Sequence, residues 1–270
     1  GNIMNNGGIA KRLIALAELV TGRVPGSLVH TNIVGNMLFG ALSGSAVAAA
    51  AAIGGTMSKQ QRERGYDPAF TAAANIASAP SGLLIPPTTA FIVYSMIAGG
   101  TSIAALFMAG AVPGILMGLT VIAVALVYAI RKKYPTSGHV SAAQAGKTIL
   151  EAIPALLLIV IVVGGIVAGI FTATEGAGIA VAYCLILSLL YRSLTWSDIK
   201  AIMARTIGTT GVILLLIAAS SAMSWVMAYT GMPQAISDLL LGVSDNPIVI
   251  LLLINVVLIV VGTFMDLSLI

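Results

Sequence analysis

Residues 28–56 read LVHTNIVGNMLFGALSGSAVAAAAAIGGT, a run of apolar or small side chains with Ser43, Gly44 and Ser45 near its centre. Hydroxyls and a glycine at membrane depth are costly unless they line a cavity or a site. The flanking arms, residues 28–42 and 46–57, are about 15 and about 12 residues long, and a helix needs roughly 20 residues to cross a bilayer. The run therefore predicts two short helices joined by an unwound Ser-Gly-Ser tip.

Basic residues stand on both sides of this run. Those before it are Lys11, Arg12 and Arg23, and those after it are Lys59, Arg62 and Arg64. Because Lys and Arg favour the cytoplasmic side, the run should enter and leave the membrane by the same face, as a re-entrant hairpin does. The alternative is one tilted spanning helix whose two serines bond to its own carbonyl groups.

The composition predicts an all-α polytopic membrane protein. Hydrophobic residues make up 59% of the 270 residues and charged residues 8%, with a mean hydropathy of +1.06, whereas a soluble domain has about 25% charged residues. The net charge of +4 lies in short loops and indicates orientation, with no sign of a nucleic-acid surface. One cysteine, Cys184, and two distant histidines exclude a disulfide framework and argue against zinc or iron–sulfur ligation.

A second interrupted element is expected over residues 69–101. Residues 69–79 and 90–100 read as half-helices, and the segment between them, PSGLLIPPTT, contains Pro80, Pro86 and Pro87. Each proline removes a backbone donor, so all three are expected to break the helical hydrogen-bond ladder. Residues 102–130 then form a span that ends on three basic residues, a positive-inside signal.

Residues 153–191 repeat the opening pattern of apolar arm, polar centre and apolar arm. The expected tip is residues 172–176, TATEG, and basic residues on both sides favour a second hairpin, although an arm of about 18 residues leaves two full spans possible. The chain is expected to be one membrane domain, 1–270, cut from a longer protein. An arm helix is expected within 1–27, which either lies at the membrane interface or packs against other parts of the protein. The other expected parts are a short helix at 141–151, a basic helix at 192–205, and two spans within 206–270 joined by an external loop at 231–246.

Three polar clusters at membrane depth are the candidate site: residues 43–45, 86–89 and 172–175. Unwound backbone exposes carbonyl oxygens, hydroxyls add further oxygen ligands, and half-helix ends add partial charges, a combination that suits Na⁺ beside a carboxylate. Glu175 is either a functional intramembrane acid or a partner of the helix N-terminus. Asp266 ends the last span, and it is either part of the ion site or simply a residue at the membrane interface.

Several stretches together resemble the large membrane subunit of tripartite ATP-independent periplasmic (TRAP) transporters. They are GNIMNNGGIAKRL at 1–13, FGALSGSAVAAAAAIG at 39–54, RGYDPAFTAA at 64–73, IPPTTAFIVYSMIAGGTSIAALFMAGAVPG at 85–114, GIFTATEG at 169–176 and VGTFMDLS at 261–268. The chain departs from the family pattern at Ala49, where an acid is usual, and at Ala173, where proline is frequent. The second Thr-Pro-Pro turn of the family is absent from this sequence, so a second ion site is expected to be incomplete.

The resemblance implies Na⁺-coupled, elevator-like import of organic acid anions such as C4-dicarboxylates or sialic acid. It also implies inverted repeats, a small membrane subunit (Q-type), a periplasmic binding protein (P-type) and a bacterial inner membrane. The implied sodium ligands are Ser43, Gly44, Ser45, Pro86, Pro87 and Thr88 at one site, with Gly262, Thr263 and Asp266 near a second. The substrate candidates are Ser45, Thr88, Thr89, Thr172, Thr174 and Glu175.

Three other functions are alternatives to transport. A channel would need a continuous polar path or a ring of charges. An intramembrane serine protease would need a histidine partner for Ser43 or Ser45, and the only histidine nearby, His30, lies in the same apolar segment. A purely structural membrane subunit would use the polar tips only for packing. No catalytic residue is predicted.

Overall fold

The computed structural model describes residue 3 and residues 9–98, 100–138, 141–191, 193–243 and 246–264. Within these ranges the chain forms α-helices and no strands, which confirms the all-α prediction. The chain divides into two compact units, residues 1–202 and residues 203–270.

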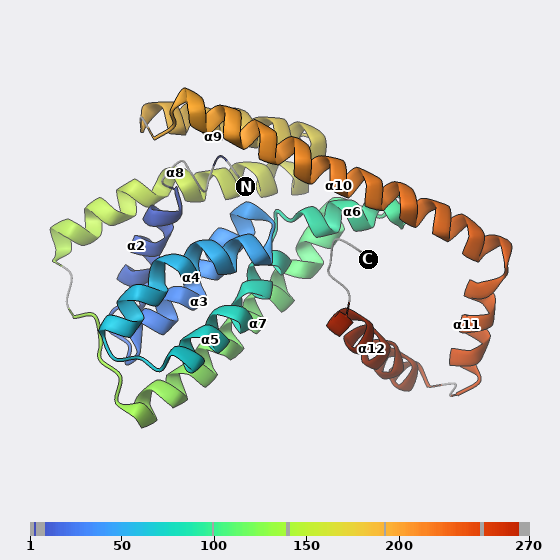
Figure 1. The fold of residues 1–270 in the computed structure, drawn as a ribbon, viewed down its shortest axis with the longest axis horizontal. Helices are drawn as coiled ribbons and strands as arrows, with labels where there is room; N and C mark the ends of the chain where they lie inside the picture. Colours follow the sequence, from blue (N-terminus) through green and yellow to red (C-terminus); the bar gives the residue numbers. More distant parts are fainter. Residues whose placement is uncertain are drawn as a thin grey trace. The chain divides into compact units, whose positions relative to one another are not determined.

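The first unit is built around one helix, α3 (Ser27–Ser43), which packs against four others (Figure 1). The helices in contact with α3 are α2 (Ile9–Thr21), α4 (Ala46–Glu63), α5 (Pro68–Leu84) and α7 (Ile103–Lys132). The remaining helices are α6 (Thr89–Ile97), which packs on α7, α8 (Ala142–Val167), which packs on α2, and α9 (Ala173–Leu190), which packs on α8. Polar side chains begin several of them: Asp67, Ser102 and Ser141 each accept a hydrogen bond from an amide of the first turn.

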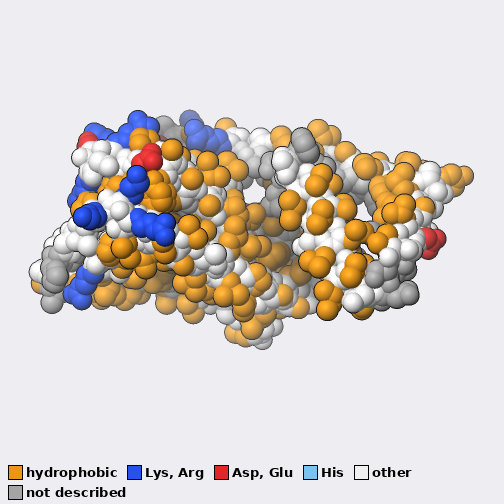
Figure 2. Space-filling view, turned by 90° about the horizontal axis from the view of Figure 1, so that it is seen from below, with side chains coloured by type: hydrophobic (Ala, Val, Ile, Leu, Met, Phe, Trp, Pro, Cys, Tyr) orange, Lys and Arg blue, Asp and Glu red, His pale blue; other side chains and the backbone are white. Residues whose placement is uncertain are grey.

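Four helices of the described residues are long and apolar enough to cross a membrane. They are α7, α8, α9 and α10 (Trp196–Tyr229), and the bent pair of α5 and α6 is a fifth candidate. Figure 2 shows hydrophobic side chains over much of the surface, with Lys and Arg gathered in one region of it. The protein is therefore a multi-pass membrane protein, as its composition predicted.

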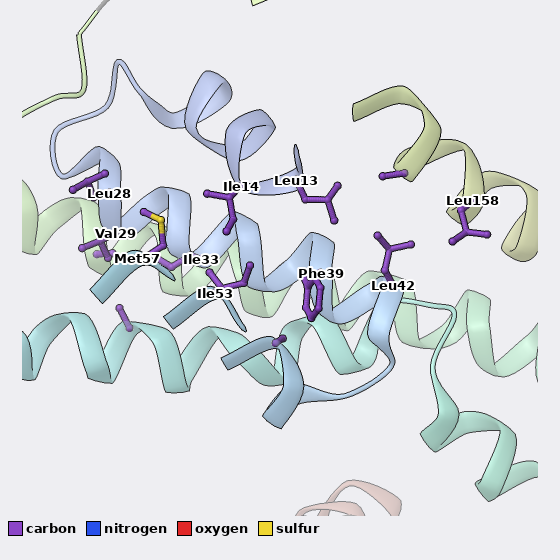
Figure 3. Packing of buried hydrophobic residues seen from close by; sticks show 14 of the residues in the cluster. Leu13, Ile14, Leu28, Val29, Ile33, Phe39, Leu42, Ile53, Met57 and Leu158 are labelled. Atoms are coloured by element: carbon purple, nitrogen blue, oxygen red, sulfur yellow. The ribbon is translucent and has the colours of Figure 1, made fainter. Parts of the chain in front are cut away.

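The core of the first unit lies where α3 meets its neighbours (Figure 3). Leu13 and Ile14 of α2 pack there beside Ile33 and Phe39 of α3, and Ile53 joins them from α4. Leu13, Ile33 and Ile53 are fully buried. The N-terminal helix, α2, therefore packs against other helices of the protein, which was one of its two expected placements.

One prediction about proline is wrong. Pro80 does not end a helix but lies inside α5, which continues to Leu84. The short helix expected at 141–151 and the apolar arm expected from residue 153 also differ from the expectation, because they form one continuous helix, α8, with Pro154 inside it. Membrane helices tolerate internal proline. Beside Pro154, Tyr183 Oη of α9 donates a hydrogen bond to the Pro154 carbonyl at 2.9 Å, which links α9 to α8.

The helices after α9 also differ from the expectation. Residues 196–205 of the expected basic helix and the span after them form one continuous helix, α10. The expected loop at 231–246 contains α11 (Met232–Leu241), whose Met232, Ile236 and Leu239 recur at helical spacing. In the second unit α11 packs against α12 (Pro247–Phe264).

Candidate functional site

The first helix break lies at Gly44 and Ser45, between α3 and α4. Gly44 has a left-handed backbone (φ 65°), which favours glycine, and its amide donates to the carbonyl of Gly40 at 2.8 Å. Ser45 is extended, and its Oγ accepts a hydrogen bond from the amide of Ala48 at 3.2 Å. One residue thus ends α3 and the next begins α4, which produces the interruption that the Ser-Gly-Ser sequence predicts.

The second break lies between Leu84 and Thr89, where α5 and α6 are bent by 51°. Pro86 and Pro87 carry no amide hydrogen, so the helical ladder cannot pass through them. Thr88 is buried (1% exposed), and its Oγ1 accepts a hydrogen bond from the amide of Ala90 at 3.2 Å. Thr88 therefore opens α6 in the same way that Ser45 opens α4.

The two breaks touch each other although 45 residues separate them. Thr89 Oγ1 donates a hydrogen bond to the carbonyl oxygen of Gly44 at 3.1 Å. A Cβ on Gly44 would lie 3.2 Å from the amide nitrogen of Thr89, which is tighter than ordinary contact. The structure thus places Ser43, Gly44 and Ser45 of the first break beside Thr88 and Thr89 of the second.

A close approach between two glycines holds the helices in this arrangement. A Cβ on Gly40 would lie 2.6 Å from the Cα of Gly82, and a Cβ on Gly82 would lie 2.4 Å from the carbonyl oxygen of Asn36. Only glycine allows two backbones to come this near. Sequence reasoning missed this contact, although Gly40 stands four residues before Gly44 and Gly82 four residues before Pro86.

Side-chain amides add a hydrogen-bond network one turn away from the glycine contact. Asn36 Nδ2 donates to Asn75 Oδ1 at 3.0 Å and to Ser78 Oγ at 2.8 Å, and Asn75 Nδ2 donates to the carbonyl of Ala50 at 3.0 Å. The network joins α3, α4 and α5, three of the four helices that end or begin at the breaks. It was not predicted, because asparagines 39 residues apart carry no periodic signal.

The ligands offered by the site are uncharged oxygens. They comprise the hydroxyls of Ser43, Ser45 and Thr88 and the carbonyl of Gly44, which accepts one hydrogen bond from Thr89 and has a second lone pair. Among the described residues no group of three His, Cys, Asp or Glu side chains could hold a metal ion. Hydroxyl and carbonyl oxygens suit a hard monovalent cation such as Na⁺, and the C-terminal end of α3 adds negative partial charge.

The third polar cluster is a helix cap. Residues 173–176, predicted as part of an unwound tip, form the first turn of α9, and the break lies at 168–172. Glu175 Oε2 accepts hydrogen bonds from the amide and the hydroxyl of Thr172 at 2.7 and 2.9 Å. This capping box agrees with the structural alternative for Glu175. The side chains of Thr172 and Glu175 bond to each other and to each other's backbone amides, and Thr174 lies in the same turn.

The second sodium site stays a prediction. Gly262 and Thr263 lie in α12 of the second unit, where Thr263 Oγ1 donates to the carbonyl of Ile259 at 2.8 Å. Asp266 lies outside the described residues.

The fold and the site define a class: multi-pass α-helical membrane proteins whose interrupted helices meet at polar tips, the arrangement that secondary transporters use. The chain belongs to the family described as "Tripartite ATP-independent periplasmic transporter, DctM component", whose model matches residues 1–270. This membership confirms the family resemblance of the sequence motifs and makes the chain a protein of the inner membrane.

Relatives agree with this membership. The chain is 50% identical over 268 residues to the uncharacterized protein YgiK of Salmonella typhimurium, covering 99% of this chain and 62% of that protein. It is 36% identical to the sialic acid TRAP transporter large permease protein SiaM of Vibrio cholerae and 35% identical to the C4-dicarboxylate TRAP transporter large permease protein DctM of Pseudomonas aeruginosa. Each of these two alignments covers 98% of this chain and 62% of the relative, so the chain spans about three-fifths of their length.

Proposed function

We propose that this chain forms part of the translocating subunit of a Na⁺-coupled secondary importer of organic acid anions, C4-dicarboxylates or sialic acid among them. The family membership supports this, as do relatives whose names give sialic acid and C4-dicarboxylate as their cargo. The importer would work with a small membrane subunit and a periplasmic substrate-binding protein, move its cargo by an elevator-like motion and carry out no catalysis.

The contact between the two helix breaks is the observation that carries the proposal. The hydrogen bond from Thr89 to Gly44 brings the C-terminal end of α3 and the N-terminal ends of α4 and α6 to one place. Carbonyl ends favour a cation, and amide ends favour a carboxylate. One site can therefore bind Na⁺ and an organic anion side by side.

In this mechanism Ser43, Ser45 and Thr88 hold the ion with their hydroxyls, together with the carbonyl of Gly44. The bound ion supplies positive charge beside the substrate carboxylate and stabilises the unwound backbone. The amides of the first turns of α4 and α6 orient the anion, with Ser45, Thr88 and Thr89 as its hydroxyl contacts. Because ion and substrate stabilise the same arrangement of the tips, each strengthens the binding of the other by the same factor.

Replacing Thr89 with valine tests this coupling, because the variant removes the hydroxyl at nearly constant volume. The loss of one hydrogen bond, about 1 kcal/mol, should raise the Na⁺ concentration for half-maximal uptake roughly fivefold. The assay is uptake of radiolabelled sialic acid or C4-dicarboxylate into proteoliposomes that contain the complete transporter and its binding protein, with Na⁺ varied.

Thr120→Val is the matched control. Thr120 Oγ1 donates within α7 to the carbonyl of Leu116 at 2.8 Å on an exposed face, so its loss should leave the Na⁺ dependence unchanged. Uptake by the unsubstituted transporter that ignores the Na⁺ gradient would overturn the proposed coupling. Uptake that never exceeds equilibrium with the outside would favour a channel.

A further inference from the structure

A groove on the first unit lies between α2, α8 and the end of α9. Its volume is about 590 Å³, and its lining includes Arg12, Gly146, Lys147, Leu150, Glu151 and Tyr191. None of these residues takes part in the two helix breaks described above. The lining combines two cations, one anion, an aromatic ring and apolar surface, a mixture that suits an amphiphilic ligand.

Arg12 is held in place by an aromatic ring. The guanidinium carbon of Arg12 lies 3.6 Å from the centre of the Tyr191 ring, a cation–π distance. Stacking fixes the plane of the guanidinium and leaves the N–H groups on its edge directed outward. Arg12 makes no ion pair in the part of the chain that the structure describes. A flat guanidinium with free edges is suited to bind two oxygens of a phosphate group.

Lys147 supplies a second cation that its neighbour only weakly engages. Its Nζ lies 3.9 Å from Glu151 Oε1, and the two side chains are 79% and 50% exposed. Exposed pairs of this kind contribute little to stability, so Lys147 can turn to another anion without much loss. With Arg12, Lys147 and Glu151 ionised, the groove carries one net positive charge.

An apolar stripe runs along α8 away from these charges. Leu150, Ile153, Leu157 and Val160 follow Lys147 at intervals of three or four residues, which places them on one helical face. They are 44–68% exposed. At 1.5 Å per residue the stripe reaches about 20 Å from Lys147, enough to cross one leaflet of a hydrocarbon core about 30 Å thick.

We propose that the groove binds an anionic phospholipid, with its phosphate between Arg12 and Lys147 and an acyl chain along the α8 stripe. A phosphate diester matches the two cations, and hydroxyls of a glycerol headgroup can donate to Glu151. The exposed apolar stripe distinguishes a lipid from free phosphate, which has no use for it. Basic groups beside transmembrane helices are known to recruit anionic headgroups. The inference requires a membrane protein but does not depend on Na⁺ coupling.

Native mass spectrometry of the complete transporter, small subunit included, tests this inference. The purified complex is equilibrated with micelles that contain phosphatidylglycerol, phosphatidylcholine or phosphatidylethanolamine, and the retained lipids are counted. Arg12→Gln and Lys147→Gln should each lower the apparent affinity for phosphatidylglycerol about fivefold. Lys59→Gln is the matched control, because Lys59 forms the same i,i+4 pair with Glu63 at 4.0 Å and is 83% exposed.

Each outcome decides the proposal. Selective retention of phosphatidylglycerol that both groove variants weaken and Lys59→Gln leaves unchanged would support it. Equal retention of the three lipids, or an equal loss in Lys59→Gln, would overturn it. Displacement by inorganic phosphate at an equal concentration would show a site for a free anion. Retention only after the small subunit is removed would show that a partner helix covers the groove.

Discussion

The glycine contact between α3 and α5 gives the sharpest test of how the site is built. In Gly40→Ala the new Cβ would lie 2.6 Å from the Cα of Gly82, whereas ordinary contact begins at 3.4 Å, so the two backbones must separate by about 0.8 Å. Overpacking of this kind costs about 1–3 kcal/mol. Gly44 lies one turn further along α3, and the same displacement there would stretch its hydrogen bond with Thr89 from 3.1 Å to about 3.9 Å, beyond hydrogen-bonding distance.

Gly40→Ala should therefore lower stability and raise the Na⁺ requirement together. The measurements are thermal unfolding of the purified complete transporter and Na⁺-dependent uptake in proteoliposomes. Gly55→Ala in the same hairpin is the control, because nothing lies within 4 Å of its added Cβ. At an exposed helix position that change should stabilise by about 0.5–1 kcal/mol. The reasoning is refuted if the two variants behave alike in both assays.

Two further predictions concern other parts of the first unit. Asn75→Ala removes the side-chain hydrogen bonds to Asn36 Nδ2 and to the carbonyl of Ala50, and should lower the free energy of unfolding by about 1–3 kcal/mol, measured by chemical denaturation. The control is Asn255→Ala, which loses only a bond to the carbonyl of Leu251 in its own exposed helix and should change the free energy of unfolding much less. Glu175→Ala removes the acceptor for the amide and hydroxyl of Thr172 and should speed amide hydrogen exchange in the first turn of α9. Glu175→Gln keeps an acceptor oxygen and should preserve the protection from exchange. Equal exchange in the two variants would contradict a capping role for Glu175.

Much of the local structure was predictable because its causes are local. A glycine with positive φ ends α3, a serine caps α4, and Pro86 with Pro87 cannot continue α5, so both breaks can be placed from neighbouring residues. The error at Pro80 arose because one missing backbone donor does not by itself end a helix. Pro80 has no amide hydrogen, yet α5 continues through it to Leu84, whereas the adjacent pair Pro86 and Pro87 lies beyond the end of that helix.

By itself the sequence determined the membrane class, the all-α fold, the family and the positions of the two interruptions at Gly44 and at Pro86 with Pro87. These properties depend on composition, on the absence of backbone donors in proline and on short motifs read in order. Only the tertiary structure decided that Gly44 and Thr89 touch, that Gly40 and Gly82 let α3 and α5 approach, and that Arg12 stacks on Tyr191. Such contacts depend on how whole helices pack, and packing geometry is set by surfaces that lie far apart in the chain.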